Sequence, residues 1–225
     1  MIMCFAPYIS LSTFIIEILL AAFFLLKNPK DNLNRIIALI SFVLGFYQLN
    51  EFLICVTGFN IFTRLAIATT VLLPAIGVYF ALIVYRSKIG YYWNALIYAP
   101  VVFFVSMFLF SSYYETSAIC STIFIEYIHW GYLGKFFGLY YLVYMLAMAV
   151  IFYFATSKVK TKAERVVAHL GVLSVFIFTV PTYIFIWFLP AFNIKFASVL
   201  CEFGLLLSIE LVILLLWKEK HKLSY

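Results

Sequence analysis

Charged side chains are scarce in this sequence. Asp, Glu, Lys and Arg make up only 11% of its 225 residues, whereas a soluble globular domain carries about 25%. So few charges cannot cover a surface that faces water, which excludes an ordinary soluble protein. The first apolar run also lacks the basic segment and the small-residue cleavage site of a secretory signal peptide, so we expect the first helix to remain in the protein.

Histidine and deeply placed lysine are scarce as well, and this excludes two kinds of seven-span protein. The three histidines, His129, His169 and His221, are too scattered to form the zinc site of a ceramidase-type hydrolase. Retinal-binding proteins need a Schiff-base lysine deep in their last span. Here Lys195 stands at the outer edge of that span and the next lysine, Lys218, stands at its inner end.

Apolar residues are abundant instead, with 67% hydrophobic and 21% aromatic residues and a mean hydropathy of +1.12. They form runs of roughly 20 residues, the length that crosses a hydrocarbon core about 30 Å thick. Only helices satisfy the backbone at that depth without closing a barrel, and these runs are too long for barrel strands. The sequence therefore predicts an all-α polytopic membrane protein, a single domain over 1–225 that forms a seven-helix bundle in a lipid bilayer. The predicted spans are 8–26, 36–57, 62–85, 91–111, 136–155, 166–189 and 194–217.

The connections between these spans are short. The longest, 112–135, ends in aromatic residues and is predicted to lie along the membrane interface, where Trp and Tyr prefer to sit. Pro74, Pro100 and Pro181 fall within spans, where proline kinks a helix and frees a backbone carbonyl. Ordinary packing is the alternative interpretation of all three prolines.

Lys and Arg gather on one side of the predicted spans. Twelve of the 15 basic residues lie there: Lys27, Lys30, Arg35, Arg86, Lys88, Lys158, Lys160, Lys162, Arg165, Lys218, Lys220 and Lys222. The other side holds Arg64, Lys135 and Lys195. The positive-inside rule places Met1 outside and Tyr225 in the cytoplasm of a plasma (inner) membrane. The net charge of +6 thus reflects orientation, and we expect no nucleic-acid partner.

Ionisable residues within the spans are costly, by roughly 2.5–3.5 kcal/mol each on insertion scales, so they mark candidate sites. Glu51 lies near the outer end of the second span, and its spacing from Gln48 and Cys55 places all three on one helix face. Glu51 should be neutral or paired, because burial disfavours the charged form. A structural hydrogen-bond cluster between helices is the alternative interpretation.

A second set of polar residues opens the seventh span. Ser198, Cys201 and Glu202 share one face, and Lys195, one turn further out, is placed to neutralise Glu202 or Glu51. Structural ion pairing is the alternative for this set. The remaining ionisable residues in the spans, Glu17, Glu210 and His169, are not assigned to the site.

All four cysteines are predicted to lie in the outer half of the membrane: Cys4, Cys55, Cys120 and Cys201. Outside a bacterial plasma membrane, thiols are free to form disulfides. Thiolates are also good ligands for zinc or copper, and His129 in the same outer segment is placed to join them. We expect Cys4 and Cys201 to approach each other, either as metal ligands or as a disulfide.

A start at Met3 gives Met3-Cys4-Phe5, which resembles uncharacterised bacterial seven-span proteins that begin Met-Cys-Phe-Ser-Ala or Met-Cys-Trp-Ser-Ala. Further matches are the pair Gln48 and Glu51 in the second span, His129 beside Trp130 before the fifth, and Cys201 and Ser208 in the last. Ala6-Pro7 replaces Ser-Ala, and Leu200 stands where Trp is usual. The resemblance supplies no reaction, but it implies a site at Cys4, Glu51, His129 and Cys201.

Three functions are compatible with these residues. The first is an outer-facing site of Cys4, Glu51, His129 and Cys201 that binds zinc or another transition metal; with one position open to water, it would hydrolyse a lipid-like substrate. The second is a non-enzymatic receptor, sensor or accessory subunit whose thiols form a disulfide. The third is proton or cation transport through the buried glutamates. The sequence names neither a protein partner nor a ligand.

The charge asymmetry makes the orientation testable. A reporter that is active only in the cytoplasm, fused after Tyr225, should be active, because the basic connections are retained inside. A reporter active only outside should be silent at the same position. The opposite pair of results would contradict both the orientation and a site that faces outward.

Overall fold

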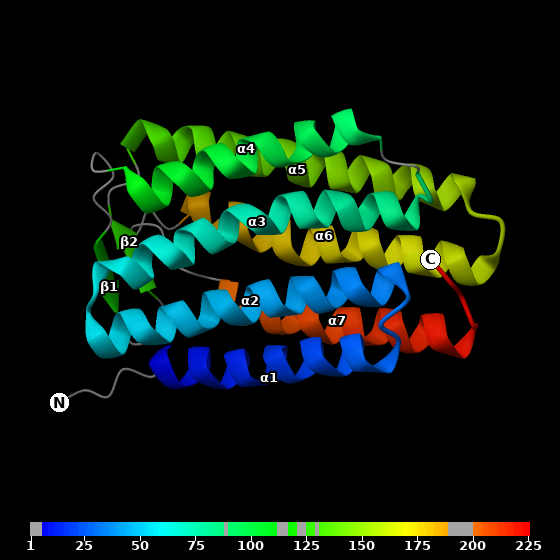
Figure 1. The fold of residues 1–225 in the computed structure, drawn as a ribbon, viewed down its shortest axis with the longest axis horizontal. Helices are drawn as coiled ribbons and strands as arrows, with labels where there is room; N and C mark the ends of the chain where they lie inside the picture. Colours follow the sequence, from blue (N-terminus) through cyan, green and yellow to red (C-terminus); the bar gives the residue numbers. More distant parts are fainter. Residues whose placement is uncertain (1–5, 88–89, 112–116, 121–124, 129–130, 189–199) are drawn as a thin grey trace.

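The computed structural model consists of seven helices packed side by side, with a short two-stranded hairpin at one end of the bundle (Figure 1). The structure describes residues 6–87, 90–111, 117–120, 125–128, 131–188 and 200–225. The helices are α1 (Ala6–Lys27), α2 (Asn32–Thr57), α3 (Asn60–Val84), α4 (Tyr91–Phe110), α5 (Gly131–Lys158), α6 (Lys162–Phe188) and α7 (Leu200–Lys220). The strands are β1 (Ser117–Cys120) and β2 (Ile125–Ile128).

Each predicted span overlaps one of these helices, which confirms the all-α class. Five helices, α1 to α5, contain a stretch among the described residues that is long and apolar enough to cross a membrane. The antiparallel hairpin was not predicted. It pairs Ser117 with Ile128 and Cys120 with Ile125, within the segment that was expected to lie along the interface.

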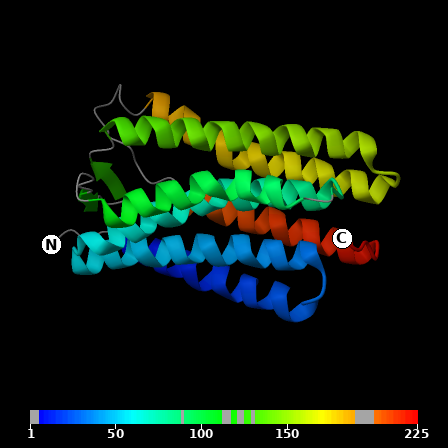
Figure 2. The same ribbon diagram turned by 45° about the horizontal axis from the view of Figure 1, so that its top comes forward.

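Successive helices run antiparallel, and α3 occupies the centre of the bundle. It packs against α2, α4 and α5, while α7 closes the bundle against α6 and reaches α1 and α2 (Figures 1 and 2). The hairpin lies at the end where α1 begins, which we call the hairpin end. The C-terminal residue lies at the opposite end, which we call the basic end (Figure 1).

The basic end is named for the described basic residues that gather there, as the sequence predicted. They are Lys27, Lys30, Arg35, Arg86, Lys158, Lys160, Lys162, Arg165, Lys218, Lys220 and Lys222. Among the described residues, the hairpin end carries Arg64 and Lys135. Arg64 donates to the carbonyls of Leu109 and Ser111, so its charge is used to cap the C-terminal end of α4.

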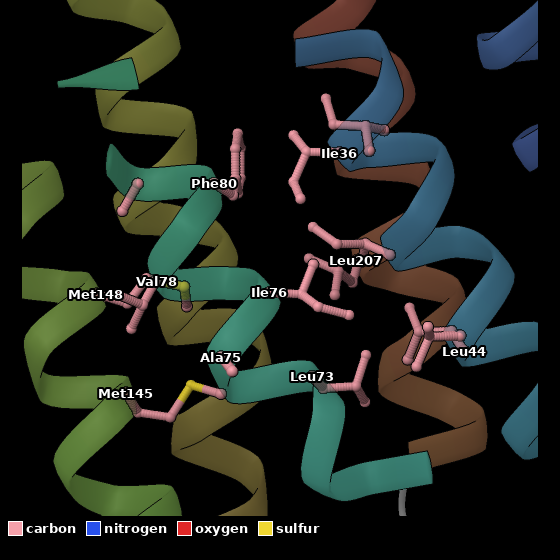
Figure 3. Close-up of a cluster of buried hydrophobic side chains, with 14 of the residues drawn as sticks. Ile36, Leu44, Leu73, Ala75, Ile76, Val78, Phe80, Met145, Met148 and Leu207 are labelled. Atoms are coloured by element: carbon pink, nitrogen blue, oxygen red, sulfur yellow. The ribbon is translucent and has the colours of Figure 1, made fainter. Parts of the chain in front are cut away.

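Aliphatic side chains and methionines fill the centre of the bundle (Figure 3). Leu73 and Ile76 of α3 point toward Leu207 of α7, while Met145 and Met148 approach α3 from α5 on its other side. Without water, tight packing of this kind supplies much of the attraction between membrane helices.

Tyrosines of α5 satisfy the backbone beside two prolines. Proline lacks an N–H and leaves the carbonyl four residues earlier without its helical donor, here Thr70 for Pro74 and Leu96 for Pro100. The Tyr140 hydroxyl donates to the carbonyl of Val71, three residues before Pro74, at 2.8 Å. One turn along α5, Tyr144 donates to Ile97, three residues before Pro100, also at 2.8 Å. The Tyr144 hydroxyl also lies 3.4 Å from the carbonyl of Leu96, which Pro100 frees. Carbonyls in the turn before each proline therefore hold α3 and α4 to α5. The side chain of Pro181 lies outside the description.

A buried ion pair closes the basic end. The Lys218 ammonium lies 2.5 Å from the Asp31 carboxylate, and the two side chains are only 3% and 6% exposed. Lys218 also donates to the Asn34 side-chain oxygen at 2.5 Å. Asp31 in turn caps α2 by accepting from the Leu33 and Asn34 backbone N–H groups. One lysine thus joins the end of α7 to the start of α2.

The residues after α7 fold back over the same end. The Tyr225 backbone N–H donates to Asp31 at 3.3 Å, and Arg86 donates to the Ser224 carbonyl while it pairs with Glu164 at 2.6 Å. Burial by itself would raise the pKa of Glu164, but hydrogen bonds from Thr161 and the charge of Arg86 outweigh it and lower that pKa below its usual range. Burial raises the pKa of Tyr225 to about 12.

Replacing Lys218 tests this closure. Lys218→Met should destabilise the protein by about 3–5 kcal/mol, because it leaves the Asp31 carboxylate buried without a countercharge. Thermal unfolding in detergent micelles measures the loss. Lys27→Met is the matched control, since Lys27 pairs with Glu219 at a half-exposed position. It should lower the free energy of unfolding by less than about 1 kcal/mol. Adding Asp31→Asn to Lys218→Met should restore most of the lost stability, because asparagine still caps the helix. Equal losses of stability for Lys218→Met and Lys27→Met would contradict the closure.

Candidate functional site: a buried polar cluster of α1, α2 and α7

One face of α1 is polar although it points into the bundle. Ser10, Thr13 and Glu17 follow one another at helical spacing, and their side chains are 2%, 4% and 0% exposed. Glu17 lies near the middle of α1. Its Oε2 has no hydrogen-bond partner among the described residues, so this carboxylate has bonding capacity left over.

The facing stretch of α2 carries the residues that the sequence singled out. Gln48 and Glu51 are both fully buried, and the Tyr47 hydroxyl donates to Glu51 Oε1 at 2.5 Å. Neither the amide oxygen nor the amide nitrogen of Gln48 finds a partner among the described residues. A buried amide without hydrogen bonds is costly, so each such group calls for an explanation.

Glycines bring α7 and α2 close to the Glu17 side chain. The Ser208 hydroxyl of α7 lies 3.5 Å from Glu17 Oε1. A Cβ atom at Gly204, one turn earlier, would stand 3.2 Å from the same oxygen and 3.9 Å from Gln48 Nε2. A Cβ at Gly45 of α2 would stand 3.3 Å from Glu17 Cβ. Both glycines therefore leave the space that the Glu17 side chain occupies.

These contacts define the polar cluster: Glu17, Tyr47, Gln48, Glu51 and Ser208. It extends from the middle of the bundle toward the hairpin end, since Glu51 lies six residues, or roughly 9 Å, before the end of α2. Glu17 of α1 and Glu51 of α2 are both fully buried. A buried carboxylate in an apolar interior favours a proton or another cation as its partner.

Glu210 is a buried carboxylate outside this cluster. It faces α6, where the Ser174 hydroxyl donates to it, and it is 4% exposed. Because Glu210 resembles Glu17 in burial but has different neighbours, it provides a control for experiments on the cluster.

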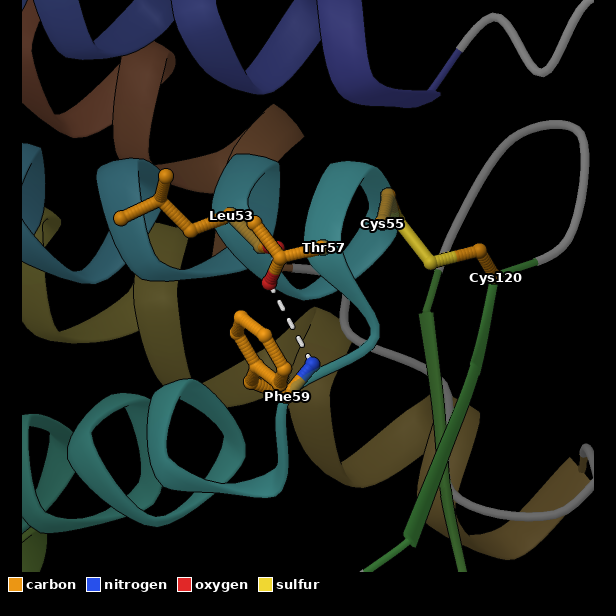
Figure 4. Close-up of a disulfide and its surroundings, with 5 residues drawn as sticks. All are labelled: Leu53, Cys55, Thr57, Phe59 and Cys120. Carbon is orange, nitrogen blue, oxygen red and sulfur yellow. Dashed lines mark hydrogen bonds between the residues drawn. A yellow bond between two sulfur atoms is a disulfide. The ribbon is translucent and has the colours of Figure 1, made fainter.

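A disulfide holds the hairpin end. Cys55 of α2 is bonded to Cys120 of β1, with 5.7 Å between the Cα atoms (Figure 4). The chain turns sharply just beyond Cys55, where Gly58 adopts a φ of 70° and the Phe59 N–H donates to the Thr57 hydroxyl. The shared face predicted for Gln48, Glu51 and Cys55 thus ends in a disulfide, which leaves Cys55 without a thiol for metal binding.

The structure does not describe the side chains of the other predicted site residues. Cys4, His129, Lys195 and Ser198 lie outside the described residues, and so do the side chains of Cys201 and Glu202, although both belong to the first turn of α7. The predicted approach of Cys4 and Cys201 stays a prediction. Within the described part of the chain, no three His, Cys, Asp or Glu side chains gather as metal ligands would.

Sequence reasoning left Glu17 out of the site, whereas the structure places it in the cluster. The signal was present in the spacing of Ser10, Thr13 and Glu17, which would have marked a polar face on α1. Gly204 was missed because the sequence does not show which side chains pack against a glycine. Here they are those of Glu17 and Gln48.

Comparisons with known proteins assign no family to this chain. No protein-family model matches it, and no curated protein or solved structure matches it either. The similarity to seven-span proteins that begin Met-Cys-Phe or Met-Cys-Trp stays a prediction, and the polar cluster is therefore the main guide to function.

The disulfide predicts a specific pair of linked peptides. Trypsin cuts after Arg35, Arg64, Lys88 and Lys135, so peptide 36–64 carries Cys55 and peptide 89–135 carries Cys120. After free thiols are alkylated, mass spectrometry should find these two peptides joined before reduction and separate after it. In Cys120→Ser, peptide 36–64 should carry an alkylated Cys55. An alkylated Cys55 in the unreduced wild type would contradict the disulfide.

Proposed function

We propose that this chain is a seven-span integral membrane protein that binds a cation in the polar cluster of α1, α2 and α7. Its hairpin end faces outward and its basic end faces the cytoplasm of a plasma membrane. The observation that carries the proposal is the burial of Glu17, Gln48 and Glu51 on α1 and α2, with open bonding capacity on Glu17 and Gln48.

Membrane insertion follows from composition and helix length. Five helices have the length and apolarity of spans, and large apolar side chains point outward along α1, α4 and α5, as a lipid-facing surface requires. The described basic residues gather at the end that we assign to the cytoplasm. Cys55 and Cys120 are joined at the other end, which fits the oxidising outer side of a bacterial plasma membrane.

A bound cation would stabilise the buried carboxylates of the polar cluster. A buried carboxylate has no water to stabilise its charge, and a second one nearby adds repulsion. A cation would neutralise Glu17 and Glu51 together and would also accept the free Gln48 oxygen as a ligand. Because Gly204 has no side chain, α7 comes close to both Glu17 and Gln48.

A transition metal, zinc first among them, is the cation that the nearby cysteines favour. Position 201 precedes Gly204 by three residues in α7, so helical periodicity puts both on one face. With Cys4 and His129 added, the donors become two thiolates, an imidazole and the Glu51 carboxylate, a reasonable zinc set. A coordination position open to water would then support hydrolysis of a lipid-like substrate.

A proton is the second candidate, favoured by the hydrogen bond from the Tyr47 hydroxyl to the Glu51 carboxylate. The carboxylate, amide and hydroxyl groups of the described cluster suit proton exchange, and polar residues continue along α2 at seven-residue spacing through Ser41 to Asn34. Proton paths in transporters run through buried Asp, Glu and His residues, of which the cluster supplies Glu17 and Glu51. A receptor or accessory subunit is the third candidate, favoured by the disulfide that fixes the outer end of α2.

Elemental analysis of the purified protein separates the first candidate from the other two. For a metal protein, about one equivalent of zinc or another transition metal should accompany the wild type and Glu210→Gln. Glu51→Gln and Cys201→Ala should lose it while they unfold at a nearly unchanged temperature. Glu17→Gln should weaken metal binding, since Glu17 lies at the end of the cluster nearest the middle of the bundle.

For a proton protein, no metal should be found. Infrared spectra should then show protonated carboxyl groups that disappear in Glu17→Gln and Glu51→Gln, and proteoliposomes should carry protons in the wild type and not in Glu51→Gln. Absence of both metal and proton flux, with wild-type stability in Glu51→Gln, would reduce the cluster to packing and leave the receptor or subunit function.

A further inference from the structure

A second candidate site lies on the outer surface of the bundle, away from the polar cluster. A groove of about 610 Å³ runs along α2 between α1 and α3, which is within the range of ligand pockets. Ile36, Leu39 and Phe42 of α2 line it, together with Ile18, Ala22 and Leu25 of α1 and Tyr79 and Ile83 of α3. Leu39 and Phe42 are 43% and 51% exposed, so the groove opens toward the surrounding lipid.

Small residues create this groove. Ala21 and Ala22 of α1 and Ala38 of α2 line it, where longer side chains would fill the space between the helices. Between Arg35 and Phe42 the groove follows α2 for roughly 10 Å. Its walls are apolar over that length, so the part within the membrane suits a hydrocarbon chain.

The groove becomes polar at its basic end. Asn32 and Arg35 line it there, and both are exposed. Three neighbouring cations have carboxylate partners, since Lys218 pairs with Asp31, Lys27 with Glu219, and Arg86 with Glu164. The guanidinium of Arg35 forms no ion pair within the described part of the chain, and Lys30 close by adds a further positive charge.

We propose that this groove binds an anionic glycerophospholipid of the cytoplasmic leaflet, with an acyl chain along α2 and the headgroup phosphate on Arg35 and Asn32. The planar guanidinium donates two parallel hydrogen bonds to a phosphate, and the Asn32 amide adds another donor. Basic pockets between helices on the cytoplasmic side are suited to anionic headgroups. The groove lies on the opposite half of α2 from Glu51, so this site does not depend on the cation site.

Native mass spectrometry of the delipidated protein in mild detergent tests the proposal, with phosphatidylglycerol and phosphatidylcholine of identical acyl chains as probes. The wild type should bind one phosphatidylglycerol about five- to thirtyfold more tightly than phosphatidylcholine, as one or two cationic contacts imply. Arg35→Gln should lose that preference and retain weak binding of both lipids. Millimolar inorganic phosphate should not compete, because it lacks the acyl chain.

Two further variants separate the headgroup contact from general effects. Ala22→Phe places a ring in the groove wall and should weaken both lipids alike. Arg165→Gln removes an exposed arginine of α6 at the same end of the bundle and should leave the preference unchanged. Equal binding of the two lipids by the wild type, an unchanged preference in Arg35→Gln, or the same loss in Arg165→Gln would overturn the proposal.

Discussion

A polar side chain in the interior of this bundle has no water to bind, so each one needs a partner within the protein or a ligand. Most have found one. Lys218 neutralises Asp31, and the hydroxyls of Tyr140 and Tyr144 reach the carbonyls beside Pro74 and Pro100. The exceptions among the described residues include Gln48 and Glu17. Because they lie together, the same constraint that organises the fold also points to its candidate site.

Hydropathy predicts the helices well because an apolar run of about 20 residues has few alternatives in a bilayer. The short basic connections predict which helix ends lie together. The hairpin of β1 and β2 escaped prediction because the aromatic residues of 112–135 suit a membrane interface as well as a strand. The pairing of Lys218 with Asp31 escaped it too, since nothing in the local sequence links positions so far apart.

The site was predictable where one helix carries its polar residues together. Gln48 and Glu51 stand one turn apart on α2, and their spacing revealed a shared face. Glu17 was passed over because it contacts Ser208 and Gly204 of α7. These residues are far from Glu17 in the sequence and come close to it only in the folded bundle. The partner of Cys55 was equally hidden, because four cysteines allow several pairings and the sequence does not choose among them.

The ion pair at the basic end also sets an order of events during synthesis. Asp31 leaves the ribosome together with the first two helices, whereas Lys218 follows only at the end of the last. Until α7 is inserted, the Asp31 carboxylate remains in water, because burial before then would leave it without a countercharge. The corner between α1 and α2 is therefore synthesised early, but the ion pair that closes it can form only after Lys218 has been made.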